Sequence, residues 1–232
     1  LDLFEKVFHH SSYTGRSGTM YGYEGLGCIY WHMVAKLLLA VQENCYLARE
    51  QGCPATVRHG LQRMYFRVRS GLGYEKSAPE FGTFPTDPYS HTPARGGAKQ
   101  PGMTGQVKEE ILTRRGELGV QVQNGALSFR PFLLRAAGFL RQATPFSYFD
   151  IQGEENRLDL PADAVAFTCC QVPVVYQEVG EGPWLEATLA DGTNHHVDGA
   201  ALDADLSAEI FGRSGKVRSL RIGVPREWLR QQ

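Results

Sequence analysis

The sequence lacks a charge imbalance and a hydrophobic run long enough for a membrane helix. Its 24 basic and 25 acidic side chains give a formal net charge of −1, so no overall basic field indicates binding to nucleic acid or to an anionic membrane. The most hydrophobic stretch, residues 29–41, is interrupted by His32 and Lys36 and is too short to cross a bilayer. We therefore predict no nucleic-acid or membrane partner.

The sequence also lacks a cysteine or histidine pattern that binds metal. The five cysteines are Cys28, Cys45, Cys53, Cys169 and Cys170. Their odd number and the absence of a Cys-x-x-Cys pair are typical of reduced thiols in the cytoplasm. The histidine pairs at 9–10 and 195–196 have no further ligands at metal spacing. We predict a cytoplasmic protein without a metal or another cofactor.

A hydrophobic helix with one polar strip is predicted near the start of the sequence. Residues 29–41 are apolar on nearly every side, which is typical of a helix enclosed by other helices. His32 and Lys36 lie four residues apart on one face, and Glu43 extends that face. The strip indicates a cavity along the helix, although a histidine bonded to a core carbonyl would fit the pattern equally well.

The loop before this helix, residues 21–27, places three glycines among two tyrosines and Glu24. Glycines allow close approach of a ligand, and tyrosines suit sugars and other flat, hydroxylated groups. We predict that Tyr23 and Glu24 bind substrate. A tight turn between two helices would account for the same glycines.

The first half of the sequence has helical periodicity. Helices are predicted over residues 1–9, 28–51, 55–68 and 104–115. A loop over residues 70–101, rich in glycine and proline, separates the last two, and loops of this length tend to be functional. We assign residues 1–117 to a helical domain. Asp87 and His91 in the loop are candidate substrate-binding residues, and solvated loop side chains are the alternative.

The second half alternates between apolar and polar residues, as strands do. Strands are predicted over residues 120–122, 127–129, 146–151, 164–168, 172–177, 184–189, 195–197 and 217–224. Asn124-Gly125 and Asp191-Gly192 predict two tight hairpin turns, and a short helix is predicted over residues 205–211. We predict that residues 118–232 form a small antiparallel β-sandwich. The chain as a whole is predicted to be α+β.

The strongest candidate for anion binding is the segment 94–105, which contains four glycines and two cations. It leads into a helix predicted to begin near Thr104, where free backbone N–H groups and the helix dipole favour phosphate. Arg95 and the Thr104 hydroxyl add donors. The segment is not a Walker A loop, because no Gly-Lys-Ser/Thr follows. Thr104 as a helix cap alone remains an alternative.

Three short segments, residues 27–35, 103–105 and 124–131, carry a family resemblance. They read Gly-Cys-Ile-Tyr-Trp-His-Met-Val-Ala, Met-Thr-Gly and Asn-Gly-Ala-Leu-Ser-Phe-Arg-Pro. In the same order they resemble the Gly-Gly-Ile/Val-Phe-Ser-His, Trp-Leu-Thr-Gly-Thr and Asp-Gly-Leu-Arg-Ile-Asp-Pro segments of the inverting glycoside phosphorylases, the cellobiose and chitobiose phosphorylase family. Trp31 and Gln106 depart from the family's serine and threonine, which leaves hydrolysis as an alternative to phosphorolysis.

The resemblance implies a fold and a position within a larger enzyme. It implies the closing helices of an (α/α)6 toroid of the six-hairpin glycosidase superfamily, followed by the C-terminal β-sandwich. The chain would then be the C-terminal fragment of a longer protein, with the remainder of the barrel as its partner. A homodimer is compatible with this arrangement.

The resemblance also implies an activity, the cleavage of oligosaccharide glycosidic bonds by phosphorolysis with inversion. His32, Thr104, Gly105 and Arg95 would hold inorganic phosphate, which is the co-substrate. The family's general acid, an aspartate, lies in an earlier part of the barrel, so we expect no catalytic residue in this chain and no activity from the chain alone. The alternatives are a hydrolase of the same superfamily and a non-catalytic carbohydrate-binding or structural module.

Overall fold

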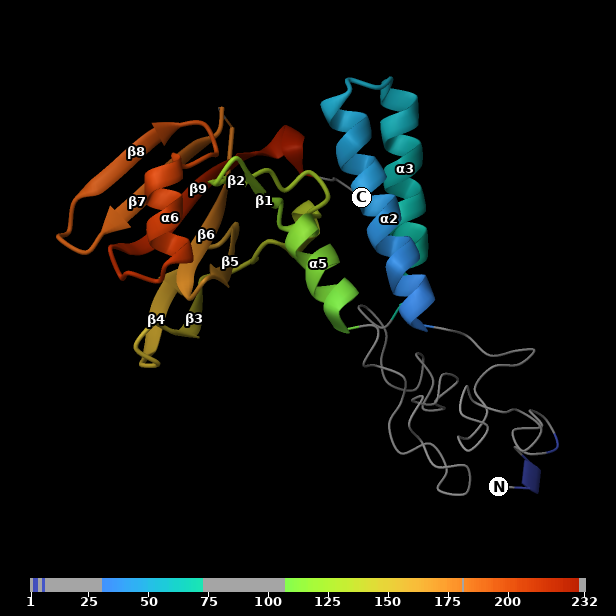
Figure 1. The fold of residues 1–232 in the computed structure, drawn as a ribbon, viewed down its shortest axis with the longest axis horizontal. Coiled ribbons are helices and arrows are strands. Elements are labelled where there is room, and N and C mark those ends of the chain that lie inside the picture. The colour runs from blue at the N-terminus through green and yellow to red at the C-terminus, as the bar shows by residue number, and fades with distance from the viewer. Residues whose placement is uncertain (1, 4–5, 7–30, 73–106, 181, 230–232) are drawn as a thin grey trace. The chain divides into compact units, whose positions relative to one another are not determined.

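The computed structural model describes residues 2–3, 6, 31–72, 107–180 and 182–229 (Figure 1). The chain divides into two compact units, residues 1–114 and 115–232. The described residues form both helices and β-sheets, consistent with the predicted α+β class. The described residues contain no helix long and apolar enough to cross a membrane.

The first unit contains a helical hairpin. Helices α2 (Trp31–Glu50) and α3 (Ala55–Arg69) lie side by side (Figure 1). Gly52 adopts φ +63° in the turn between them, which favours glycine because other residues avoid this region. A third helix, α5 (Val107–Glu117), is tied to the hairpin by Gln42, whose Nε2 donates to the Thr113 carbonyl at 2.7 Å. The described parts of the helices predicted over residues 28–51, 55–68 and 104–115 are therefore helical.

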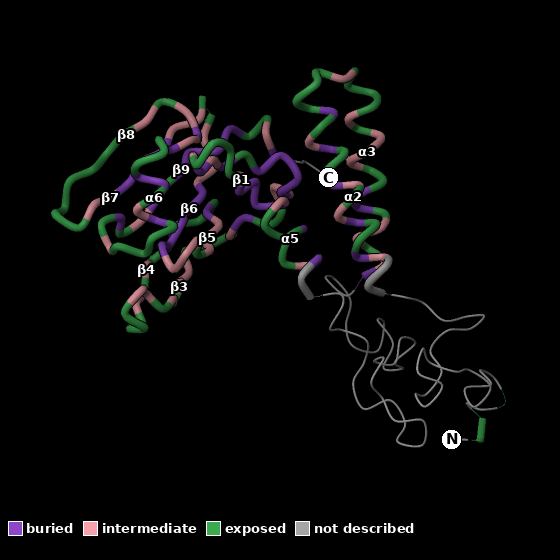
Figure 2. The backbone as a smooth tube through the Cα atoms, viewed as in Figure 1, coloured by how far each residue is buried: buried purple, intermediate pink, exposed green. Residues whose placement is uncertain are grey.

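Helix α2 is amphipathic rather than enclosed. Its buried side chains recur every three or four residues and face α3: Ala35, Leu38, Gln42, Cys45 and Ala48. On the other face Leu37 is 53% exposed and Leu47 is 47% exposed, and Lys36 and Glu43 are exposed with them (Figure 2). Among the described residues, the prediction of a helix enclosed on all sides is wrong, because α3 and the α5 contact at Gln42 bury only one face of α2.

The second unit contains nine strands and one α-helix among its described residues. The strands are β1 (Val120–Gln123), β2 (Ala126–Phe129), β3 (Thr144–Phe149), β4 (Glu155–Leu160), β5 (Ala164–Cys169), β6 (Val172–Val179), β7 (Trp184–Leu189), β8 (Asn194–Asp198) and β9 (Val217–Pro225), and the helix is α6 (Ala204–Phe211). Strands β1 and β2 pair, β3 and β4 pair, and the other five form one sheet in the order β5-β6-β9-β7-β8.

The two predicted hairpin turns are confirmed. Asn124 and Gly125 adopt φ +51° and +80° between β1 and β2, which is the type I′ geometry that Asn-Gly favours. Asp191 and Gly192 connect β7 and β8, where the Asp191 carboxylate accepts a hydrogen bond from the Thr193 N–H at 2.9 Å. Strand β4 was not predicted, because its sequence Glu-Asn-Arg-Leu-Asp-Leu has few apolar residues.

The large sheet is mixed rather than antiparallel throughout. Strand β9 pairs with β6 in parallel and with β7 in antiparallel orientation. It enters the sheet between these strands after the long connection through α6. The prediction of wholly antiparallel strands is therefore wrong for the β6–β9 pair, whose orientation depends on a pairing between distant residues such as Val174 and Leu220.

Helix α6 and the β1–β2 hairpin pack on one face of the large sheet. Their side chains form one core with the sheet, including Leu127, Phe129, Tyr176, Leu185, Leu206, Ile210, Leu220 and Ile222. On the opposite face Phe146 and Leu158 of the β3–β4 hairpin pack against Ala164 and Val175. Because this second cluster involves only β5 and β6 of the large sheet, it does not cover the same face of β9, β7 and β8.

Candidate functional site

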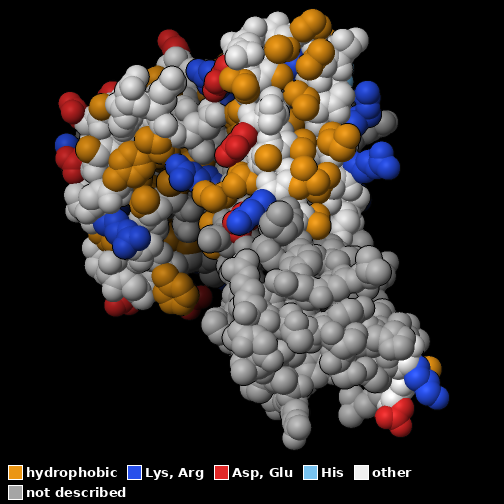
Figure 3. All heavy atoms as spheres, turned by 45° about the vertical axis from the view of Figure 1, so that its right-hand side comes forward, with side chains coloured by type: hydrophobic (Ala, Val, Ile, Leu, Met, Phe, Trp, Pro, Cys, Tyr) orange, Lys and Arg blue, Asp and Glu red, His pale blue; other side chains and the backbone are white. Residues whose placement is uncertain are grey.

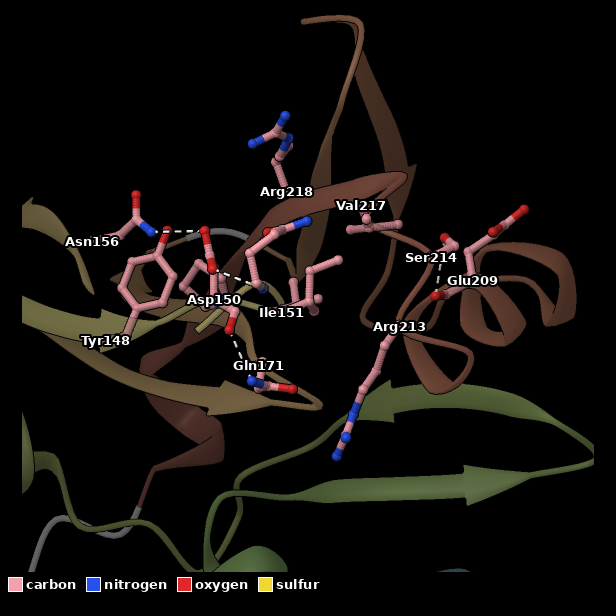
Figure 4. Close-up of a pocket in the computed structure, with 14 residues that line it drawn as sticks. Tyr148, Asp150, Ile151, Asn156, Gln171, Glu209, Arg213, Ser214, Val217 and Arg218 are labelled. Carbon is pink, nitrogen blue, oxygen red and sulfur yellow. Dashed lines mark hydrogen bonds between the residues drawn. The ribbon is translucent and has the colours of Figure 1, made fainter. Parts of the chain in front are cut away.

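The second unit has a pocket of about 290 Å³ beside the β3–β4 hairpin (Figure 4). The hairpin, the β5–β6 turn and the segment between α6 and β9 form its walls. The lining residues are Tyr148, Asp150, Ile151, Gln152, Asn156, Gln171, Val172, Pro173, Glu209, Arg213, Ser214, Gly215, Val217 and Arg218. Polar side chains therefore come from three places that are distant in the sequence.

Asp150 organises the turn between β3 and β4. Its Oδ1 accepts hydrogen bonds from the N–H groups of Gln152 at 2.9 Å and Glu154 at 3.0 Å, and its Oδ2 accepts one from Asn156 Nδ2 at 2.9 Å. Desolvation opposes ionisation of Asp150, but these hydrogen bonds and the charge of Arg218 outweigh it and lower the pKa of the carboxyl. Asp150 is thus an ionised structural acceptor.

The β5–β6 turn is hydrogen-bonded to the β3–β4 turn. Cys170 and Gln171 adopt φ +50° and +68°, and Gln171 Nε2 donates to the Asp150 carbonyl at 2.8 Å (Figure 4). At the start of the turn, burial together with the neighbouring Cys170 raises the pKa of Cys169 to about 11. Because the thiolate is the nucleophilic form, Cys169 is unsuited to nucleophilic chemistry near neutral pH.

Glu209 is the second carboxylate of the pocket, and it is also engaged. Lys216 Nζ lies 3.2 Å from Glu209 Oε1. Hydrogen bonding by Ser214 and Lys216, together with the Lys216 charge, lowers the pKa of Glu209. A general acid needs a pKa raised towards the working pH, so neither Asp150 nor Glu209 suits that role. The pocket is equipped for binding rather than for proton transfer.

Other polar groups of the pocket remain available to a ligand. Within the described part of the chain, the Tyr148 hydroxyl and the Arg218 guanidinium make no hydrogen bond. Tyr148 stacks on Phe146 with ring centroids 5.9 Å apart, and burial raises its pKa, as does the charge of Asp150. Arg213 and Arg218 extend to different sides in Figure 4, so they do not form a shared clamp for one anion. The Tyr148 hydroxyl and the Arg218 guanidinium therefore offer separate hydrogen-bonding groups to a polar ligand.

The side chains of the predicted site residues lie outside the described part of the structure. His32 lies in the first turn of α2, but its side chain is outside the described residues. The other predicted residues of the phosphate and substrate sites lie wholly outside them: Tyr23, Glu24, Asp87, His91, Arg95, Thr104 and Gly105. The phosphate site and the substrate contacts therefore stay predictions. Among the described residues, no group of three or more His, Cys, Asp or Glu side chains could hold a metal ion.

Sequence reasoning missed the pocket because its parts are far apart in the chain. The local signal was the segment Asp150-Ile-Gln-Gly153, in which an aspartate precedes a glycine with φ +82°. Asp side chains commonly accept hydrogen bonds from the backbone N–H groups that follow them. This pattern predicts a turn, but it does not predict that the β5–β6 turn and Arg218 lie beside it.

Comparison with models of protein families finds none that matches the sequence. Comparison with curated proteins also finds no match.

Proposed function

We propose that this chain is the C-terminal fragment of a carbohydrate-active enzyme that cleaves oligosaccharide glycosidic bonds by phosphorolysis with inversion. The observation that carries the proposal is the ordered set of three segments, residues 27–35, 103–105 and 124–131, that resembles the inverting glycoside phosphorylases. The third segment contains the turn and the second strand of the β1–β2 hairpin, which follows α5 where helices give way to strands. This is the position expected for the boundary between the barrel and the β-domain.

The exposed apolar residues of the helical hairpin support a place in a toroid. Leu37 and Leu47 of α2 and Val57 and Met64 of α3 are between 47% and 53% exposed. Figure 3 shows hydrophobic side chains on the surface of the protein. Neighbouring helices of an (α/α)6 barrel would cover them, and burying the exposed half of each would contribute about 1 kcal/mol. The β1–β2 hairpin and the large sheet, which share one core, would form the C-terminal sandwich.

In the proposed reaction, His32, Thr104, Gly105 and Arg95 hold the inorganic phosphate. A phosphate oxygen attacks the anomeric carbon from the face opposite the glycosidic oxygen, and the glycosidic C–O bond breaks. A carboxylic acid outside this chain gives its proton to the leaving oxygen. The products are a sugar 1-phosphate of inverted configuration and a shortened oligosaccharide. Tyr23, Glu24, Asp87 and His91 contact the sugar in this scheme.

Phosphate dependence tests the proposal. The protein, with the remainder of the proposed barrel, is incubated with β-linked oligosaccharides in the presence and absence of inorganic phosphate. We expect sugar 1-phosphate to form only with phosphate, and we expect His32→Ala to raise the KM for phosphate. Release of reducing sugar without phosphate would instead identify a hydrolase of the same superfamily.

A non-catalytic carbohydrate-binding module is the second candidate. The pocket favours it, because both of its carboxylates have lowered pKa values and make hydrogen bonds that leave them unsuited to acid catalysis. Oligosaccharide binding without phosphate-dependent turnover, in the protein that includes the remainder of the proposed barrel, would support this function over the enzyme.

A further inference from the structure

One face of the large sheet is open to solvent at strands β9, β7 and β8. The strand register places three rows of side chains side by side on this face: Gly223, Trp184 and Asp198, then Arg221, Glu186 and His196, then Ser219, Thr188 and Asn194. Arg221 and His196 are exposed, and Trp184 and Glu186 are half-buried. The alternate residues of the same strands, such as Leu185 and Ile222, are buried in the core on the other face.

Gly223 allows the Trp184 indole to lie against the sheet. A Cβ atom at position 223 would be 2.3 Å from the indole Nε1 and 2.5 Å from Cε2, which is closer than real atoms approach. No other residue type would leave room for the ring at this position. The His196 imidazole lies 6.4 Å from the indole at an interplanar angle of 26°. The two rings therefore give the sheet a flat aromatic surface.

Planar polar groups border the two rings. Glu186 lies between Arg221 and His196 on neighbouring strands. Arg221 donates a hydrogen bond to Gln177 Oε1 at 3.3 Å, and His196 Nε2 lies 3.5 Å from the Asp198 carboxylate. Directly opposed residues on paired strands are about 5 Å apart, a spacing comparable with one pyranose ring. Donors and acceptors are thus available on both sides of the aromatic surface.

We propose that this surface, the Trp184 platform (Trp184, Glu186, His196, Arg221 and Gln177), binds a pyranose unit of an oligosaccharide. The apolar face of the sugar would stack on the indole, while the carboxylate, guanidinium and amide groups would bond its hydroxyls. The proposal takes its ligand class from the proposed function. The platform residues differ from those of the predicted phosphate site and from those that line the pocket.

The composition of the platform disfavours other partners. None of the nine residues in the three rows is Val, Leu, Ile or Met. The face therefore lacks the apolar core of a protein interface. Glu186 and Asp198 lie among Arg221 and His196, so the face has no excess positive charge for a phosphate backbone. A neutral, hydroxylated ligand satisfies both observations.

Binding of cellotetraose and chitotetraose to the full chain, measured by isothermal titration calorimetry, tests the platform. We expect the wild-type chain to bind at least one of them, and we expect Trp184→Ala to weaken that binding about tenfold or more. Gly223→Ala keeps the tryptophan but displaces its ring, and we expect a loss of similar size. Phe149→Ala removes an aromatic side chain that is 62% exposed on β3, outside the platform, and should leave binding unchanged.

Circular dichroism and the melting temperature identify variants that fold, and only those are compared. Absence of binding by the wild-type chain would overturn the proposal, and so would unchanged binding by folded Trp184→Ala and Gly223→Ala variants. Loss of binding in these variants without phosphate-dependent cleavage by the protein would support the platform and contradict phosphorolysis. The two proposals therefore fail in different experiments.

Discussion

The Ser207 hydroxyl in α6 accepts a hydrogen bond from the backbone N–H of Leu127 in β2 at 2.9 Å. The same hydroxyl donates to the Asp203 carbonyl at 2.6 Å. Ser207 and Leu127 are both fully buried, so this side chain connects the helix to the β1–β2 hairpin inside the core. Because a buried N–H without a partner is costly, the bond controls how α6 packs on the hairpin.

We expect Ser207→Ala to lower the free energy of unfolding by about 1–3 kcal/mol, because it leaves the Leu127 N–H buried and unpaired. Urea denaturation of the two proteins measures the difference. Ser147→Ala, at an exposed position of β3, is the control and should change stability by less than about 0.5 kcal/mol. Equal effects of the two substitutions would show that the Ser207 bond contributes nothing specific.

The substitutions Gly119→Ala and Gly125→Ala separate steric clash from backbone conformation. Both glycines have positive φ, +70° and +80°, so alanine at either position costs about 1 kcal/mol. A Cβ at position 119 would also lie 2.1 Å from the Arg130 carbonyl carbon, whereas nothing lies within 4 Å at position 125. We therefore expect Gly119→Ala to be far more destabilising in thermal unfolding. Similar melting temperatures for the two variants would contradict the packing at Gly119.

The stability of the protein should depend on Asp150 in acid. The pKa of this carboxyl is lowered in the folded state from its ordinary value of 3.8. Its stabilising contribution is complete above the ordinary value and is lost as the pH falls through the lower, folded-state value. We expect Asp150→Asn to reduce the fall in melting temperature between neutral pH and about pH 3.

Asp159→Asn is the control for this pH dependence. Asp159 has a side chain that is 91% exposed and lies 3.8 Å from Arg157 Nε, an exposed pair of the kind that contributes little to stability. We expect its melting curve to respond to acid as the wild type does. An acid response of Asp150→Asn identical to that of the wild type would disprove the role of Asp150.

Two cysteines should resist alkylation in the folded protein. Burial raises the pKa of Cys45 and that of Cys169 to about 11. Because thiols react through the thiolate, both should react with iodoacetamide much more slowly at about pH 8 than after denaturation. Mass spectrometry of peptides after timed labelling measures the two rates. Equal rates before and after denaturation would contradict the raised pKa values of both thiols.

The features predicted correctly are those that depend on neighbouring residues. Asn124-Gly125 and Asp191-Gly192 determine their turns through positive φ angles and local side-chain bonds. The helices α2 and α3 follow from apolar residues repeated at helical spacing. Strand β4 was missed because only Leu158 and Leu160 carry its apolar signal.

The sequence alone determined the helices, most strands and the hairpin turns, because each depends on contacts within a few residues. The tertiary structure decided the rest. The parallel pairing of β6 with β9, the exposure of Leu37 and the meeting of Asp150 with Gln171 depend on which distant segments pack together. Such pairings depend on the burial of the whole hydrophobic core, so no pattern among neighbouring residues predicts them.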